Sequence, residues 1–181
     1  MSATKKLTGL AAALLLAGCV DVELEIPVST GVSTVPGDEN LYSHQTTLHD
    51  ALLAPLRIDD GLGLGDQDLS SATLVEFQLD VPACTVAGTD TDDLGFIQSM
   101  TIFVEPLSTG SRLPRLPIAW YVKGKVGAFD GTTVLFDVDS GIELLEYVQE
   151  GFLITATSEA AVPHDDVSIE GTATFVALPA R

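Results

Sequence analysis

The sequence predicts an all-β protein, an antiparallel two-sheet sandwich with immunoglobulin-like packing and one or two short helices. Hydrophobic residues make up 46% of its 181 residues, which is enough to build a packed core. Seven segments alternate apolar and polar side chains, as strands with one buried face do. No long helical segments separate these strands, so a parallel α/β sheet is not expected.

The first half of the chain predicts two strands and one short helix. Residues 21–28 alternate strictly and predict a half-buried strand, followed by a loop over residues 29–40, where Ser, Thr, Gly and Pro gather. Residues 47–54 predict a brief helix, because the segment opens with capping-box spacing and Pro55 follows it. Residues 73–81 alternate again and predict the second strand.

The second half predicts five more strands and a clearer helix. Ser140 and Glu143 have the spacing of a capping box, an apolar stripe follows them, and Gly151 is placed to end the helix. The predicted strands span residues 96–107, 118–126, 132–138, 152–161 and 167–178.

The chain is strongly acidic, with 26 acidic and 8 basic residues and a net charge of −18. Such a surface repels nucleic acid, so no nucleic-acid partner is expected. Two interpretations of the charge remain open. The acidic surface keeps a tethered domain soluble, or its carboxylates collect calcium or a basic partner.

The N-terminus has the three-part layout of a secretory signal. Lys5 and Lys6 supply positive charge, an apolar run covers residues 7–17, and small residues precede Cys19. The apolar run has about half of the roughly 20 residues that a membrane-spanning helix needs. The segment is therefore expected to act as a leader and not as a transmembrane helix.

The end of this leader, Leu16-Ala17-Gly18-Cys19, resembles the lipobox of bacterial lipoprotein precursors. The resemblance implies a diacylglyceryl thioether on Cys19, cleavage after Gly18 and a further acyl chain on the freed amine. Residues 1–18 are then a cleaved signal peptide and residues 19–181 one domain. The alternative is an ordinary signal peptide that ends near Ala17 and leaves Cys19 unmodified.

The resemblance also implies a location and a partner. The partner is the lipid bilayer, reached through acylated Cys19, because two or more acyl signals hold a protein stably at a membrane. In familiar enteric bacteria Asp after the lipidated Cys favours the inner membrane. Val20 stands there, which favours the outer membrane of the cell envelope. With Cys19 modified, Cys84 is predicted to be a lone core thiol, and no disulfide is expected.

No pattern in the sequence predicts an enzyme or a cofactor. The glycines of residues 61–65 lack the spacing of a dinucleotide fingerprint, and no G-x-S-x-G elbow occurs. His164 stands beside two aspartates, but adjacent residues point in different directions. His44 and His49 lack the spacing of a zinc pair. The prediction is a non-enzymatic structural or binding module whose partner is another envelope protein.

Calcium is the alternative ligand. Asp90, Asp92 and Asp93 lie in an acidic turn, and hard cations prefer oxygen ligands. The turn is not an EF-hand loop, because Leu94 and Thr101 stand where ligands are required. A solvated loop is favoured over a calcium site. A calcium-dependent adhesion-type module stays as the second function, and a carboxylate-based hydrolase as the third.

Positive charge is concentrated in one stretch of the sequence. Four of the six basic residues that follow the leader are Arg112, Arg115, Lys123 and Lys125. Together with Tyr121 they predict a patch that binds an acidic partner or lipid headgroups. The alternative is an edge strand that lysines and prolines protect against pairing with other chains, and this alternative is favoured.

Overall fold

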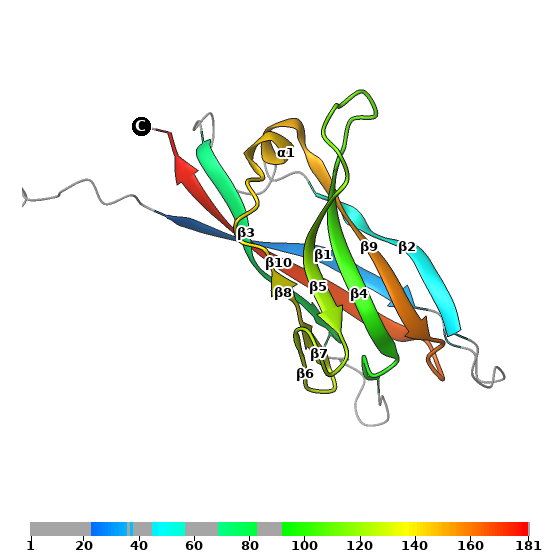
Figure 1. Cartoon of the computed structure of the whole chain (residues 1–181). Helices are drawn as coiled ribbons and strands as arrows, with labels where there is room; N and C mark the ends of the chain where they lie inside the picture. Colours follow the sequence, from blue (N-terminus) through cyan, green and yellow to red (C-terminus); the bar gives the residue numbers. More distant parts are fainter. Residues whose placement is uncertain (1–22, 36, 38–44, 57–68, 83–91, 181) are drawn as a thin grey trace, which may run out of the picture.

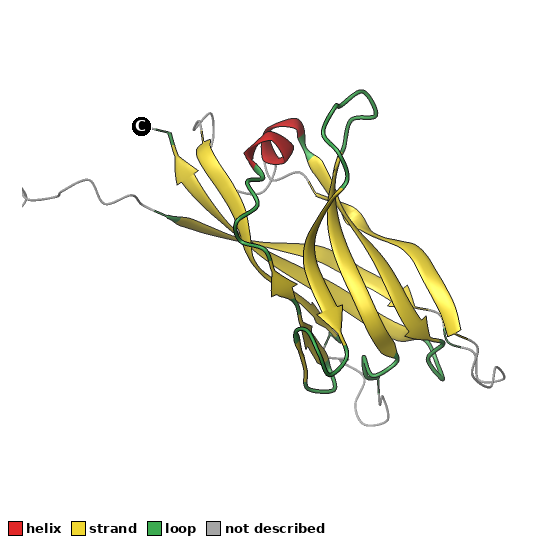
Figure 2. Ribbon diagram, viewed as in Figure 1, coloured by secondary structure: helices red, strands yellow, loops and turns green. Residues whose placement is uncertain are grey.

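The structure is a computed structural model that describes residues 23–35, 37, 45–56, 69–82 and 92–180, with the backbone alone described for 45–56. Within these residues the chain forms two antiparallel five-stranded sheets, and Figure 2 shows how strands dominate. The predicted all-β two-sheet sandwich is confirmed. One short helix is present in the described residues.

The first sheet, called sheet A, joins the two ends of the domain. Its first strand in the chain, β1, pairs with its last strand, β10, and the two run side by side in Figure 1. The strand order is β1-β10-β3-β7-β6, with bounds Leu24–Val35, Val167–Pro179, Leu69–Asp80, Thr133–Leu135 and Ala128–Phe129.

The second sheet, called sheet B, packs against sheet A. Its strand order is β2-β9-β4-β5-β8, with bounds Gln45–Leu56, Phe152–Ala161, Ile97–Pro106, Leu116–Val122 and Asp137–Val138. The inner faces of both sheets form one hydrophobic core. Its fully buried members include Phe77, Leu79, Ile102, Ile118, Phe152, Ile154 and Phe175.

Two predictions in the first half are wrong. The loop predicted over residues 29–40 is, as far as Val35, the second half of β1. The helix predicted over residues 47–54 is β2, which pairs with β9 and carries two bulges, one of them beside Pro55. A short helical signal is weak because nucleating a helix is costly, and pairing with a long neighbouring strand overrides it.

A bulge in β1 explains how its polar second half joins the sheet. The register shifts between Ser29 and Val32, and Gly31 takes the left-handed φ of 75° that the bulge requires. The buried Thr30 hydroxyl accepts a hydrogen bond of 2.8 Å from the N–H of Gly171 on β10. The side chain thereby satisfies a backbone group that the interrupted ladder would leave unpaired.

The predicted strand over residues 132–138 is divided between the two sheets. β7 pairs with β3 in sheet A, and β8 pairs with β5 in sheet B. Phe136 lies between them, and its ring packs edge-to-face against Phe77 with 5.1 Å between the ring centroids. The chain therefore crosses the core at this residue.

The helix α1 spans Leu145–Glu150 and ends at Gly151, as predicted. Its predicted start at Ser140 is wrong, because the helix begins after Leu144, which makes no side-chain cap. Glu143 supplies the missing acceptor. Its carboxylate accepts hydrogen bonds from the N–H of Leu145 at 2.9 Å, the N–H of Ala72 at 2.8 Å and the Ser71 hydroxyl at 2.6 Å. It fastens the helix to the start of β3.

These contacts change the acidity of Glu143. Partial burial raises the pKa of its carboxyl, but the hydrogen bonds from Ser71 and the neighbouring backbone N–H groups outweigh burial and lower the pKa below its ordinary value. A carboxyl whose pKa is lowered by folding stabilises the fold above its unfolded pKa. That contribution is lost as the pH falls through the folded pKa.

Replacing Glu143 with Gln is expected to lower the free energy of unfolding by about 1 kcal/mol at neutral pH, the usual effect of losing a helix cap. The difference from the unmodified protein shrinks in acid, where the Glu143 carboxyl is itself protonated. Urea unfolding at neutral and acidic pH measures both values. Glu150→Gln at the other helix end is the control, and an equal loss for both variants contradicts the assignment.

Gly171→Ala is expected to destabilise the fold by about 1–3 kcal/mol, the usual cost of overpacking a core. A Cβ at this position would lie 2.9 Å from Oγ1 of Thr30 and 3.3 Å from Cζ of Phe77. The control is Gly110→Ala, where the nearest atom to the new Cβ is 3.8 Å away. Thermal unfolding of both variants measures the effect, and equal stabilities would show that the Thr30 bulge tolerates the methyl group.

Candidate functional site

The loops at one end of the sandwich, called the distal end, line a pocket of about 330 Å³ that is open to solvent. The loop between β9 and β10 forms one wall, and the turn that precedes β4 forms the other. The N–H of Ala161 donates to the carbonyl of Phe96 at 2.9 Å and joins the two walls. The lining residues are Asp92, Asp93, Phe96, Val162, Pro163, His164, Asp165 and Val167.

Carboxylates around this pocket hold the loops in place. The Asp92 carboxylate accepts a hydrogen bond of 3.3 Å from the N–H of Ser168, at the start of β10. Asp93 accepts one of 2.6 Å from the N–H of Gly95, two residues further on, and so closes its own turn. Asp166 accepts one of 2.9 Å from the N–H of Gly37, just after β1. Three separate chain segments thus meet at the distal end.

The lining combines negative charge with apolar surface. His164 and Asp165 are exposed, whereas Pro163 and Val167 are buried. A concave surface lined by carboxylates concentrates cations, so the chemistry of the pocket suits a cationic group. Sequence reasoning missed the pocket because its walls lie about seventy positions apart in the chain.

The calcium alternative gains little from this geometry. Asp92 and Asp93 line the pocket, while Asp90 lies outside the described residues. Across the described segments, no three His, Cys, Asp or Glu side chains converge on a position that would hold a metal ion.

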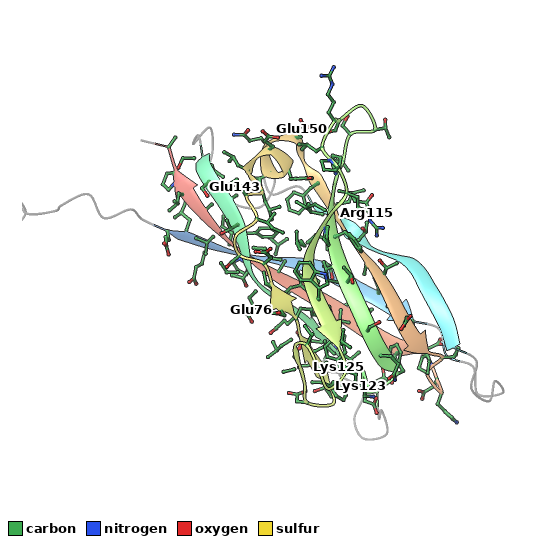
Figure 3. The ribbon with its side chains drawn as sticks, in the orientation of Figure 1. Glu76, Arg115, Lys123, Lys125, Glu143 and Glu150 are labelled. Atoms are coloured by element: carbon green, nitrogen blue, oxygen red, sulfur yellow. The ribbon has the colours of Figure 1, made fainter. Side chains whose placement is uncertain are left out.

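The predicted basic patch is not a single surface. Arg112 and Arg115 precede β5, and Lys123 and Lys125 follow it. A strand of seven residues is roughly 20 Å long, so it separates the two pairs. Figure 3 shows Arg115 at one end of the sandwich and both lysines at the other. The prediction that the four groups act together is therefore wrong.

Two of these basic groups have local partners. Nε of Arg115 lies 2.8 Å from the Glu105 carboxylate, and its guanidinium stacks over the Phe103 ring at 3.7 Å. These contacts join the residue just before β5 to β4 on the outer surface of sheet B. Nζ of Lys123 donates to the carbonyl of Gly95 at 2.5 Å. This contact supports the turn beside the distal pocket.

Tyr121, predicted as part of the patch, lies in the core with 1% of its surface exposed. Trp120 and Val122, on either side of it in the sequence, lie half-buried on the outer surface of β5. The Tyr121 hydroxyl is buried and has no hydrogen-bond partner among the described residues. Burial raises the pKa of this hydroxyl.

The predicted lipidation site, Gly18 and Cys19, lies outside the described residues, as does Cys84. The first described strand, β1, begins at Leu24, five residues after Cys19. In the part of the chain that the structure describes, no helix has the length and apolar character needed to cross a bilayer.

No protein-family model, curated protein or solved structure matches the chain. The fold defines the class, an all-β protein with two packed antiparallel sheets. Function therefore has to be argued from the residues themselves.

Tyr121→Phe is expected to leave the stability unchanged or to raise it, because it removes a buried hydroxyl that lacks a partner. The matched variant is Tyr147→Phe, which removes a hydroxyl that donates to the carbonyl of Pro114 at 2.7 Å. That variant is expected to lose about 1 kcal/mol. Chemical denaturation ranks the two, and an equal loss for Tyr121→Phe would show that its hydroxyl is hydrogen-bonded.

Proposed function

We propose that this chain is a lipid-anchored lipoprotein of the bacterial cell envelope. We further propose that its sandwich is a non-enzymatic binding or structural module. The observation that carries the proposal is the lipobox-like Leu16-Ala17-Gly18-Cys19 directly ahead of a β-sandwich. The outer membrane is the proposed location, because Val20 follows the cysteine.

This proposal places the sandwich close to the bilayer. An extended chain spans at most about 3.6 Å per residue, so the five steps from Cys19 to Leu24 reach about 18 Å. Acyl chains on Cys19 would hold the folded body close to the bilayer. Three acyl chains exceed the two signals that stable attachment requires.

The strand edges favour binding through loops and faces over strand addition. β6 and β8 are two residues long, and β1 combines Pro27 with the bulge after Ser29. β2 carries two bulges along its length. Short, bulged or proline-bearing edges resist pairing with another chain. The loops of the distal end are the better candidates for contact with a partner.

Charge indicates the chemistry of that partner. The chain carries a net charge of −18, and carboxylates line the pocket at the distal end. A protein of the envelope that presents basic groups would be attracted to this end over long range, more strongly at low salt. The carboxylates of Asp92 and Asp93 bind backbone N–H groups, which supports a structural role for them over a catalytic one.

Replacing Cys19 with Ser tests the anchor. The variant is expected to lose the acyl mass from its N-terminal peptide and to leave the membrane fraction after a high-salt wash. Cys84→Ser is the matched control, which removes the other cysteine and is expected to stay with the membrane. Mass spectrometry and fractionation measure both outcomes. If Cys19→Ser is processed normally and remains with washed membranes, the proposal fails.

A further inference from the structure

We infer that the distal pocket holds a basic side chain, Lys or Arg, of a partner protein. Its charged end meets the Asp165 carboxylate, and its apolar stem lies along Phe96. This inference rests on the binding module proposed above and names the chemistry of its partner. It does not depend on the lipid anchor.

Asp165 provides a carboxylate that the fold itself does not use. The residue is exposed, and within the described residues its side chain has no hydrogen bond and no ion pair. In this it differs from Asp92 and Asp93, whose carboxylates accept backbone N–H groups and still carry negative charge. Three carboxylates thus line a concave space, and its described lining contains no Lys or Arg. Such a space attracts a cation that comes from outside the chain.

The spacing of these carboxylates favours an organic cation over a metal ion. In the described part of the chain, no three side chains of His, Cys, Asp or Glu converge closely enough to hold a metal. A calcium ion needs six or more oxygen ligands at about 2.4 Å. An ammonium or guanidinium group instead binds through its own N–H donors, so one or two carboxylates are sufficient.

The rest of the lining suits the apolar stem of a basic side chain. Phe96 and Val162 are half-buried at the pocket, and Pro163 and Val167 are buried. Lys and Arg lay their methylene stems along apolar surface and keep the charged end in water. An aromatic ring also attracts a cation that lies over its face. The pocket is open to solvent, so a side chain of a partner can enter it.

Neighbouring segments fix the wall that carries Asp165. Gly37 lies so close to the backbone of Asp165 that a Cβ at position 37 would collide with it. The N–H of Gly37 also donates to the Asp166 carboxylate at 2.9 Å. A wall that is fixed before binding loses little conformational freedom when a ligand enters, and this favours affinity.

Blocked amino acids test the pocket, because their only charge is on the side chain. Nα-acetyl-lysine methylamide and its arginine and norleucine counterparts are titrated into the full acylated chain in micelles of an uncharged detergent. The ring signals of His164, which lines the pocket, report binding by NMR, and the His164→Gln variant assigns them. We expect saturable shifts with the lysine and arginine compounds. We expect none with the norleucine compound, which has a similar stem without the charge.

Asp165→Asn and Asp137→Asn are the matched variants. Both residues are exposed, each change removes one negative charge, and Asp137 lies on β8 outside the pocket. Asp165→Asn is expected to weaken binding of the lysine compound about three- to fivefold, the effect of losing one exposed ion pair. Asp137→Asn is expected to leave binding unchanged, because salt screens a distant charge.

Three results would overturn the inference. The first is equal weakening by both variants, because overall negative charge alone would then attract the cation. The second is the absence of any shift, or equal binding of the norleucine and lysine compounds. The third is tighter binding of the free diamine cadaverine than of either basic compound, which would identify a free polyamine as the ligand. The anchor is tested separately, since a chain found to lack acyl groups would refute it and leave these titrations valid.

Discussion

The packing of the two sheets against each other depends on Phe136, where the chain passes from sheet A to sheet B. β7 closes sheet A against β3, β8 closes sheet B against β5, and Phe136 alone separates the two strands. Its N–H donates to the carbonyl of Phe77 at 3.0 Å, while its ring packs against Phe77 and Tyr121. Both the backbone and the ring of Phe136 are therefore held in the core, at the point where the chain passes from sheet A to sheet B.

The proposed anchor connects to this core through an edge strand. β1 is the outermost strand of sheet A, and a bulge interrupts its pairing with β10 in the middle. The Thr30 hydroxyl restores one hydrogen bond at the interruption, and Gly171 leaves the space that the Thr30 side chain occupies. The bulge bends β1 and makes its open edge irregular, and an irregular edge resists pairing with another chain.

Alternation in the sequence predicted the extents of several strands even where bulges interrupt their pairing, but it did not predict which side chains are buried beside a bulge. β9 has the predicted bounds, and β4, β5 and β10 lie close to theirs. In β3 the register shifts near Val75, so Leu74 is buried and Val75 is 42% exposed, although Phe77 and Leu79, at the same alternating positions as Val75, are buried. A bulge is set by the partner strand, so one segment read alone does not reveal it. For the same reason neither the crossing at Phe136 nor the distal pocket was predictable, since each depends on segments distant in sequence.

The acidic residues form local hydrogen bonds and also set the long-range charge of the surface. Both roles are compatible with this fold, which explains how it tolerates a high negative charge. Asp93, Asp130 and Asp139 each accept a backbone N–H two residues further along, and so each closes a turn at the surface. Such groups lie in solvent, where screening limits their mutual repulsion. Over longer range the same charges favour a partner that presents basic groups, and the proposed acyl anchor would hold the sandwich near the bilayer even though its charge opposes anionic headgroups.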